Sequence, residues 1–442
     1  MELVILVPCC FFLVALIKFL YDYLWVPLRI QHMMNSQGIK GPPYRFIHGN
    51  SKEVARLEQE ALSKRVALTD DIFPKVLPHF YTWINRYVIR EEFCLYWNGA
   101  RPELGISEPE LIKEKLSDIG REFLGNGLLF IAGEKWAKHR KLANHAFHGE
   151  SLKNMTPAII TSVETMLEKW KKGQEGREIE VLQEFRLFTS EVISRTAFGS
   201  SYLQGEKIFS MLQKLTIIMS RNLFKSRIPL IREDEAVNGE VNSFGNDFLG
   251  LLVNAYHDSD EKNRFSLEDL LAECKTFYFS GQETVNSLLS WIVLHLAIHG
   301  DWQEKARREV IDIFGNRNAH LEGVAKLKIM TMIINETLRL YVHRDPHFWG
   351  DDVHHFKPER FAEGIAKATN YTAAAFLPFG LGPRSCVGMT FAMIETKIVL
   401  SMILQRYTFT LSPTYVHSPI FVLSIRPQHE IQVILEPPHH NA

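Results

Sequence analysis

The first 28 residues of the chain are almost wholly apolar. Residues 3–17 carry no charge. Residues 19–28 are also mainly apolar, and the only charged residues within 3–28 are Lys18 and Asp22. The uncharged run is shorter than the roughly 20 residues that a membrane span needs, but the long stem of Lys18 can carry its charge to the membrane surface. A cleavable signal peptide is the competing interpretation, yet the chain has no basic region before the apolar run and no small-x-small cleavage site after it. We therefore expect a retained membrane anchor.

The charges around this segment predict its orientation. Only Glu2 precedes the segment, whereas Arg29, Lys40 and Arg45 follow it. Because basic residues stay on the cytosolic side, the rest of the chain is expected in the cytosol. Two consecutive prolines within residues 38–44 prevent a helix from continuing there. The sequence thus predicts an anchor over residues 1–28, a stiff hinge over 29–50 and one main domain over 51–442.

Within the main domain, apolar residues recur at the three-and-four spacing of helices. This pattern predicts helices over residues 155–173, 180–197, 208–220, 267–299 and 388–406. Strand-like stretches are few, and residues 421–426 and 431–435 are predicted to form a closing hairpin. No internal repeat or second linker interrupts the pattern. The expected fold is mainly α with small β-sheets (α+β).

Composition and charge exclude several classes of function. Hydrophobic residues make up 46% of the chain and include 29 Phe, which suits a large core with an apolar ligand site. The 50 Lys and Arg nearly balance the 51 Asp and Glu, so the net charge of −1 gives no electrostatic footprint for nucleic acid. None of the five cysteines forms a C-x-x-C pair that would chelate zinc.

One cysteine stands in a specialised context. Its surroundings follow the pattern Phe-x-x-Gly-x-Arg-x-Cys-x-Gly, made by Phe379, Gly382, Arg384, Cys386 and Gly388. Average residue usage predicts such a match by chance in about one chain in ten thousand. A helix that starts just after the cysteine aims its first amides at the sulfur, and the glycines, Gly380 among them, allow close backbone approach and positive φ around a flat macrocycle. The arginine can pair with a propionate while the phenylalanine excludes water. We interpret Cys386 as the thiolate ligand of a haem iron, against the alternative of an ordinary buried cysteine.

Residues 280–284 read Ser-Gly-Gln-Glu-Thr in the middle of a predicted helix. Helix propensity disfavours both Gly281 and Thr284 at such a position, so another requirement must select them. Taken alone, the pattern could be a chance feature of a buried helix. The position of this pattern about a hundred residues before Cys386 favours the interpretation that these residues have a function.

Two other residue pairs share a helix face. Glu336 and Arg339 are three residues apart, and Trp136 and Arg140 are four apart. An isolated Glu-x-x-Arg is usually a solvated ion pair, and an isolated Trp-x-x-x-Arg equally suits an amphipathic surface helix. Their functional interpretation depends on the rest of the chain.

These motifs together resemble the cytochromes P450, from the proline-containing segment to the C-terminus. Residues 38–50, 140–153, 189–202 and 404–419 further resemble a plant clan of that family, numbered seventy-two. The resemblance implies a cytochrome P450 fold behind an N-terminal transmembrane helix.

The resemblance also implies roles for individual residues. Gly281 would loosen the oxygen-activating helix near the haem, and Glu283 with Thr284 would relay protons. Trp136 and Arg140 would bind a haem propionate. In the segment 358–361, Arg360 would complete a buried Glu-Arg-Arg triad with Glu336 and Arg339, which would serve as scaffolding for the haem pocket.

The activity implied by the resemblance is oxidation of a hydrophobic small molecule by O2. The expected cofactor is haem b (iron protoporphyrin IX), with electrons from NADPH through NADPH-cytochrome P450 reductase at the endoplasmic reticulum membrane. Terpenoids or plant hormones would be the substrates. A haem-thiolate isomerase or dehydratase and a non-enzymatic haem-binding or haem-free protein are the alternatives.

The chain departs from the family pattern at three places. After the Glu-x-x-Arg helix, Leu340 and Tyr341 run straight into residues 342–346, so several tens of residues are missing, among them a strand beside the haem and a basic propionate contact. Smaller deletions are expected around residues 116–120 and 230–235. A lost strand leaves backbone groups unpaired at about 1–3 kcal/mol each, against a total stability of about 5–15 kcal/mol. A shortened, catalytically impaired variant is therefore a further hypothesis.

Overall fold

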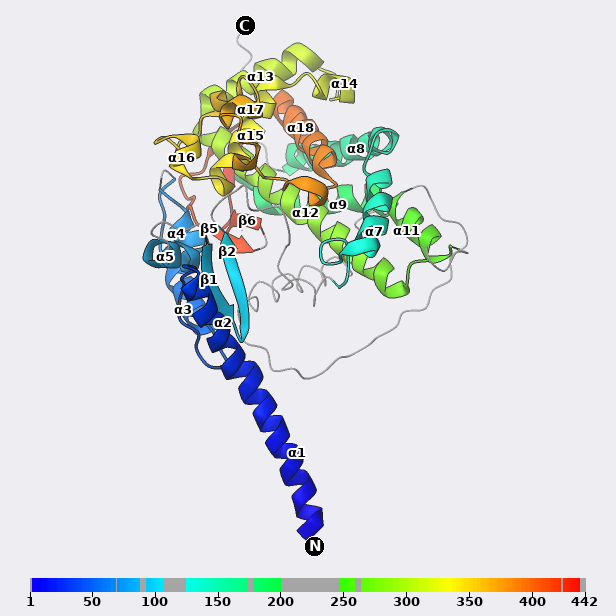
Figure 1. Ribbon diagram of the computed structural model, residues 1–442. Coiled ribbons are helices and arrows are strands. Elements are labelled where there is room, and N and C mark those ends of the chain that lie inside the picture. Colours follow the sequence, from blue (N-terminus) through cyan, green and yellow to red (C-terminus); the bar gives the residue numbers. More distant parts are fainter. Residues whose placement is uncertain are drawn as a thin grey trace. The chain divides into compact units, whose positions relative to one another are not determined.

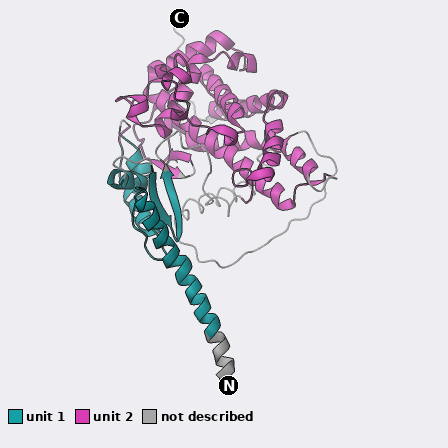
Figure 2. Ribbon diagram, in the orientation of Figure 1, with its two compact units in different colours: residues 1–66, 71–112, 221–236 teal, residues 67–70, 113–220, 237–442 magenta. Residues whose placement is uncertain are grey.

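A computed structural model describes residues 2–68, 70–87, 93–106, 125–173, 178–199, 247–258, 264–422 and 424–437. The chain divides into two compact units (Figures 1 and 2). Unit 1 comprises residues 1–66, 71–112 and 221–236, and unit 2 comprises residues 67–70, 113–220 and 237–442. The predicted helix at 208–220 and the two smaller predicted deletions lie outside the described residues.

Unit 1 begins with one long helix (Figure 1). It consists of α1 (Glu2–Leu20), the π-helical turn η1 (Tyr21–Trp25) and α2 (Val26–Ser36), which follow one another without a break. The stretch Cys10–Ser36 is long and apolar enough to cross a membrane. The helix continues past residue 28, so residues 29–36 are helical and do not belong to a hinge. The mixed composition of these residues hid the continuation, because they carry polar groups that a membrane span would avoid.

The rest of unit 1 packs short helices beside a hairpin. The helices are α3 (Ser51–Leu62), α4 (Phe73–Val76) and α5 (Pro78–Tyr87), and the strands are β1 (Phe93–Asn98) and β2 (Arg101–Ile106). The strands are antiparallel, with Phe93 opposite Ile106. Val54, Trp83 and Cys94 form a buried cluster between these elements.

Residues 38–50 are an integral part of unit 1. Lys40 forms a parallel bridge with Cys94, and the amide of Leu95 donates to the Lys40 carbonyl at 3.0 Å. At Gly41 a Cβ atom would lie 1.7 Å from the Leu95 carbonyl oxygen, so only glycine permits this approach. The prolines break the helix as predicted, but the segment pairs with β1.

Unit 2 is mainly helical. Its helices are α7 (Gly133–Ala146), α8 (Glu150–Gly173), α9 (Val181–Ala197), α11 (Phe248–Tyr256), α12 (Leu267–Ile298), α13 (Gly300–Phe314), α14 (Leu321–Val324), α15 (Lys328–Val342), α16 (Pro346–Trp349), α17 (Ile365–Ala368) and α18 (Met389–Arg406). Three 3-10 turns are η4 (Pro358–Phe361), η5 (Ala373–Ala375) and η6 (Gly382–Arg384). The predicted helices at 180–197, 267–299 and 388–406 are confirmed to within a residue, and the helix predicted to start at 155 starts at Glu150.

The central helix α12 is stabilised at its start and buried along its length. Ser266 and Asp269 form a capping box, in which the Ser266 hydroxyl accepts from the Asp269 amide at 3.1 Å. Most residues from Val285 to Leu296 are buried. The helix packs closely on α9. Several residues of the candidate site lie on this helix.

Two small sheets complete unit 2. Strands β3 (Glu178–Glu180), β7 (Gln432–Glu436) and β4 (Thr408–Leu411) form an antiparallel sheet in that order. Strands β5 (Pro419–Val422) and β6 (Ser424–Pro427) pair only with each other. The predicted hairpin between 421–426 and 431–435 is therefore wrong. The chain turns between Val422 and Ser424, and residues 432–436 pair with strands that are remote in the sequence.

Candidate haem-thiolate site

Cys386 lies in a short loop between η6 and α18. The Cys386 amide donates to the Phe379 carbonyl at 2.7 Å, which closes the loop. Gly380 and Gly382 both have a φ of 73°, a conformation that side chains disfavour. Gly380 and Gly382 are thus needed for the backbone conformation around the cysteine, as the sequence predicts.

The Cys386 thiol is accessible to solvent but close to protein groups that influence its ionisation. The surrounding atoms raise the pKa of the thiol by desolvation, whereas the Gly388 amide and the Arg140 guanidinium lower it. Helix α18 starts at Met389, so the amide that reaches the sulfur is the one at its N-cap. Gly388 itself has a φ of −90°. The positive φ predicted for this glycine is therefore absent.

Three side chains named by the sequence converge beside the cysteine loop. Arg140, on α7, donates from Nη1 to the Ser385 carbonyl at 2.5 Å. Arg384 donates to the Ile131 carbonyl at 2.6 Å, and its guanidinium carbon lies 5.1 Å from the centre of the Trp136 ring. The structure thus brings Trp136, Arg140 and Arg384 together with Cys386.

Two contacts between polar side chains join α7 to α12. Lys135 lies 2.5 Å from Asp269, and one turn further along both helices His139 lies 2.6 Å from Glu273. The second pair is fully buried, with both side chains only 2% exposed. Sequence reasoning missed these contacts. Lys135 and His139 are four residues apart, as are Asp269 and Glu273, and these equal spacings were the available signal. Nothing in the sequence, however, indicates that the two helices pack together.

On α12 the predicted distal residues point in different directions. Thr284 is exposed, and its hydroxyl donates to the Ser280 carbonyl at 2.6 Å. Glu283 is buried and lies 3.3 Å from Arg426 of β6. Burial raises the pKa of Glu283, although Arg426 and Arg186 act in the opposite direction. The structure therefore places the acid and the hydroxyl next to each other in sequence but in different surroundings.

Gly281 has a packing reason that the sequence did not suggest. A Cβ atom there would lie 2.7 Å from Cδ1 of Ile193 on α9. The helix stays α-helical through this position, so the loosened turn that we expected is absent. A methyl group at position 281 would therefore force the Ile193 side chain on α9 to move.

The three residues of the predicted scaffold triad lie together, with Glu336 and Arg339 buried and Arg360 partly exposed. The Arg339 guanidinium binds both Glu336 oxygens, at 2.7 and 2.9 Å, and neither side chain is exposed. Arg360 lies 3.6 Å from Glu336. Arg339 also donates to the Val353 carbonyl at 2.7 Å, and Arg360 donates to the Trp349 carbonyl at 2.9 Å. The three residues join α15 to the segment that precedes the cysteine loop.

His343 is a further residue that sequence reasoning missed. It follows α15 directly, and its Nε2 accepts from the Leu377 amide at 2.8 Å, two residues before Phe379. Burial and the nearby Arg339 lower the pKa of His343 to about 4, so the ring is neutral and can accept this bond. No strand lies between α15 and α16, in agreement with the predicted deletion after Tyr341.

The residues around Cys386 fit a haem. The thiol is accessible to solvent, and the glycines of the loop have no side chains to cover it. Arg140 and Arg384 each have N–H groups that are not used in the hydrogen bonds described above. Within the described residues no cluster of His, Cys, Asp or Glu could hold a metal ion by itself. An iron held mainly by a macrocycle needs only one protein thiolate, so this set of donors agrees with haem.

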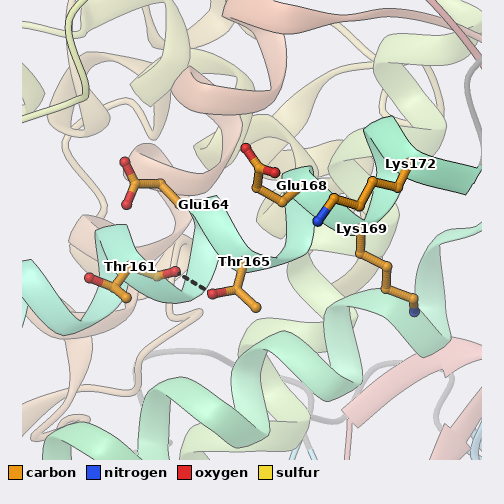
Figure 3. A pocket seen from close by; sticks show the side chains of 6 residues that line it. All are labelled: Thr161, Glu164, Thr165, Glu168, Lys169 and Lys172. Carbon is orange, nitrogen blue, oxygen red and sulfur yellow. Dashed lines mark hydrogen bonds between the residues drawn. The ribbon is translucent and has the colours of Figure 1, made fainter.

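A separate groove of about 640 Å³ lies on α8 (Figure 3). Its lining residues all come from one helix and are polar: Thr161, Glu164, Thr165, Glu168, Lys169 and Lys172. Lys169 lies 2.5 Å from Glu184 of α9. The charges are those of a solvated helix face, and we assign no function to this groove.

Comparison with known proteins defines the class. The cytochrome P450 family model matches residues 104–234, 228–342 and 341–435. Cytochrome P450 CYP749A22 of Panax ginseng is 47% identical over 504 aligned positions, which cover 97% of this chain and 95% of the relative. The chain belongs to the cytochrome P450 family and is a plant-type cytochrome P450 monooxygenase.

Other relatives carry names that state an activity. The 11-oxo-beta-amyrin 30-oxidase of Glycyrrhiza uralensis is 37% identical over 93% of this chain and 94% of its own length. The 7-deoxyloganic acid hydroxylase of Catharanthus roseus is 34% identical over 94% of this chain and 95% of its own length. Family membership implies a haem-iron cofactor, electrons from a redox partner and hydrophobic substrates.

The comparisons also bear on the missing segments. The 504 aligned positions exceed the 442 residues of this chain, so at least 62 positions of the Panax ginseng relative have no counterpart here. The family model matches the chain in three separate segments, and neighbouring segments meet at residues 228–234 and at residues 341–342. These are two of the three places where the sequence predicts a deletion.

Proposed function

We propose that the chain is a haem b monooxygenase that oxidises a hydrophobic small molecule of the terpenoid class. The convergence of Arg140, Arg384 and Trp136 on the Cys386 loop carries this proposal, because the group combines a thiol that could bind iron with cations that could bind haem propionates. Two relatives whose names state oxidation of an amyrin and hydroxylation of a deoxyloganic acid support the substrate class. The family motif residues Phe379, Gly382 and Gly388 shape the loop.

Each residue has a definite task in this proposal. Cys386 would bind the iron, and Arg140, Arg384 and Trp136 would hold the propionates. When bound, haem supplies oxygen activation with reductase-derived electrons. Thr284 holds a proton on its Oγ1 at an exposed point of α12, and the buried Glu283 can exchange protons when its contact with Arg426 opens. The triad of Glu336, Arg339 and Arg360 holds the segment before the cysteine loop in place.

The proposed setting is the cytosolic face of the endoplasmic reticulum membrane. The apolar helix Cys10–Ser36 supports a single-pass attachment, and the basic residues after it support the orientation. Electrons would come from NADPH through NADPH-cytochrome P450 reductase in the same membrane.

Reduction of the purified full chain in lipid nanodiscs under carbon monoxide tests the site. A red-shifted Soret band is expected, because a thiolate donates electron density to the iron. NADPH-dependent turnover of a triterpenoid such as an amyrin, with added reductase, then tests the reaction. Turnover without NADPH would point instead to the haem-thiolate isomerase or dehydratase.

A second candidate is a shortened, catalytically impaired haem-binding or haem-free variant. Three observations favour it: the direct passage from α15 to α16, the start of a new segment of the family match at residue 341, and the positions of the Panax ginseng relative that have no counterpart in this chain. Absence of the red-shifted band together with absence of bound haem would favour a haem-free chain. A normal band without NADPH-dependent turnover would favour an impaired enzyme.

A further inference from the structure

Helix α7 contacts the cysteine loop with one side and α12 with another. Trp136 and Arg140 are four residues apart and share the side that faces Arg384 and the loop. Lys135 and His139 each precede one of these residues, so their side is rotated by about 100° and faces α12. The rotation of α7 about its axis therefore determines both sets of contacts at once.

On the α12 side, His139 makes the buried contact. Its Nδ1 lies 2.6 Å from Oε1 of Glu273, and both side chains are 2% exposed. Its ring also stacks on Phe265, with 4.2 Å between the ring centres. Lys135 is 48% exposed in its contact with Asp269, and water weakens a pair of this kind. Of the two contacts, that of His139 constrains α7 more, because a polar contact shielded from water is the stronger one.

The same turn of α12 also receives the segment that precedes α7. A Cβ atom at Gly127 would lie 2.4 Å from Oγ1 of Thr276, so the backbone of this segment lies directly on the helix. Burial raises the pKa of Glu273, whereas His139 and the Leu128 amide lower it. Glu273 thus interacts both with α7 and with the segment before it.

The two arginines of the candidate site depend on these two parts of the chain. Arg140 extends from α7, and it donates from Nε to Asn144 at 3.0 Å and from Nη1 to the Ser385 carbonyl at 2.5 Å. Arg384 donates to the Ile131 carbonyl, which belongs to the segment before α7. A displacement of α7 or of this segment would therefore change the positions of both guanidinium groups.

We propose that His139 and Glu273 are positioning residues of the haem site. Their buried contact sets the rotation of α7 at which Arg140 and Trp136 face the haem propionates. Glu273 also keeps the segment that binds Arg384 on the same turn of α12. Neither residue binds the haem itself, and both act through the arginines. The inference rests on the proposed haem function and adds two residues that maintain haem binding.

A paired substitution separates positioning from folding. His139→Phe keeps an aromatic ring against Phe265 but leaves the Glu273 carboxylate buried without its partner. Glu273→Met in the same chain removes that carboxylate, so the double variant should unfold in urea near the native midpoint. The polar contact between α7 and α12 at this turn is then absent. His145→Phe, at an exposed histidine of the same helix, is the matched control.

The rate of haem loss measures the positioning. The haem-loaded full chain in lipid nanodiscs is mixed with excess apomyoglobin, and transfer of haem is followed by absorbance. The double variant is expected to lose haem about tenfold faster than the native chain, and the His145 variant at the native rate. Glu273→Gln keeps an oxygen acceptor for His139 and should retain a rate close to native.

The same substitutions in an Arg140→Met chain show whether the pair acts through the arginine. The double substitution should then accelerate haem loss by less than about threefold, because only its effect through Arg384 remains. Equal acceleration with and without Arg140 would overturn the inference, since the pair would then support the fold in general. A native rate in the double variant, or a Glu273→Gln rate as fast as that of the double variant, would overturn it as well.

The native chain distinguishes this inference from the proposed function. A red-shifted Soret band and slow haem loss in the native chain, with no effect of the double substitution, would leave the proposed function standing and overturn the positioning role alone. A native chain that takes up no haem would overturn both.

Discussion

At the scale of single residues, Cys386 is distinguished from the buried Cys94 and the partly buried Cys274 by its loop and its accessibility. Cys386→Ala removes the thiol whose pKa the nearby Arg140 lowers, and it is expected to abolish the red-shifted Soret band of the carbon monoxide complex. Cys274→Ala is the matched control, because this partly buried thiol on α12 should leave the band unchanged. A band that persists without Cys386 would disprove the ligand assignment.

The buried ion pair between Glu336 and Arg339 gives a second prediction. Arg339→Ala leaves an unpaired carboxylate in the core, which should lower the free energy of unfolding by about 3–5 kcal/mol in urea denaturation. Arg308→Ala breaks an exposed pair with Glu304 on α13 and should cost less than about 1 kcal/mol. Similar losses in both variants would show that the triad is not a special scaffold.

At the scale of secondary-structure elements, the contact between α9 and α12 depends on Gly281. Helix propensity alone would make Gly281→Ala stabilising, but the new methyl group would overlap Ile193, so a loss of about 1–3 kcal/mol is expected. Ile193→Val removes the nearest methyl group and should reduce that loss in the double variant. Gly300→Ala on α13 has free space and serves as the control. A Gly281→Ala chain of unchanged stability would exclude the packing role.

His343 joins the end of α15 to the segment before the cysteine loop. Its pKa is lowered from 6.5 to about 4 in the folded chain, so the unfolded chain takes up the proton first as the pH falls. The stability due to His343 is therefore complete above about pH 6.5 and is lost down to about pH 4, by about 3 kcal/mol in total. His343→Gln keeps an acceptor for Leu377 and cannot titrate.

Denaturation midpoints at pH 7, 5.5 and 4.5 check this prediction. The decline of stability with falling pH should be smaller in His343→Gln than in the native chain. Parallel declines would mean that other histidines, such as His79 with its pKa lowered to about 4, dominate the pH dependence.

At the scale of the whole molecule, we expect the residues missing after Tyr341 to affect how much haem the chain retains. Insertion, between Tyr341 and Val342, of the strand-containing segment that the family pattern has after the Glu-x-x-Arg helix should raise the red-shifted Soret absorbance per chain. The restored strand would pair backbone groups and cover apolar surface beside the haem. A glycine–serine insert of equal length is the control and should bring no gain. Equal absorbance in all three chains would show that the deletion is tolerated.

The sequence by itself determined the class of protein and predicted Cys386 as its thiolate ligand. The local pattern around Cys386 is sufficient because its requirements lie within ten consecutive residues, where turn, capping and ligand chemistry coincide. Helices α9, α12 and α18 were predicted to within a residue for the same reason, since apolar periodicity and end signals are local. The deletion near residue 341 could be predicted because the family pattern normally runs without interruption through the region that follows the Glu-x-x-Arg helix.

Only the tertiary structure decided what depends on partners that are remote in sequence. It paired α7 with α12 through His139 and Glu273, gave Gly281 a packing role against Ile193, and assigned residues 432–436 to the sheet of β3 and β4. It also paired Lys40, in the segment after the anchor, with residues of β1. These outcomes depend on which surfaces meet in three dimensions, and the periodicity of one segment carries no information about its partner.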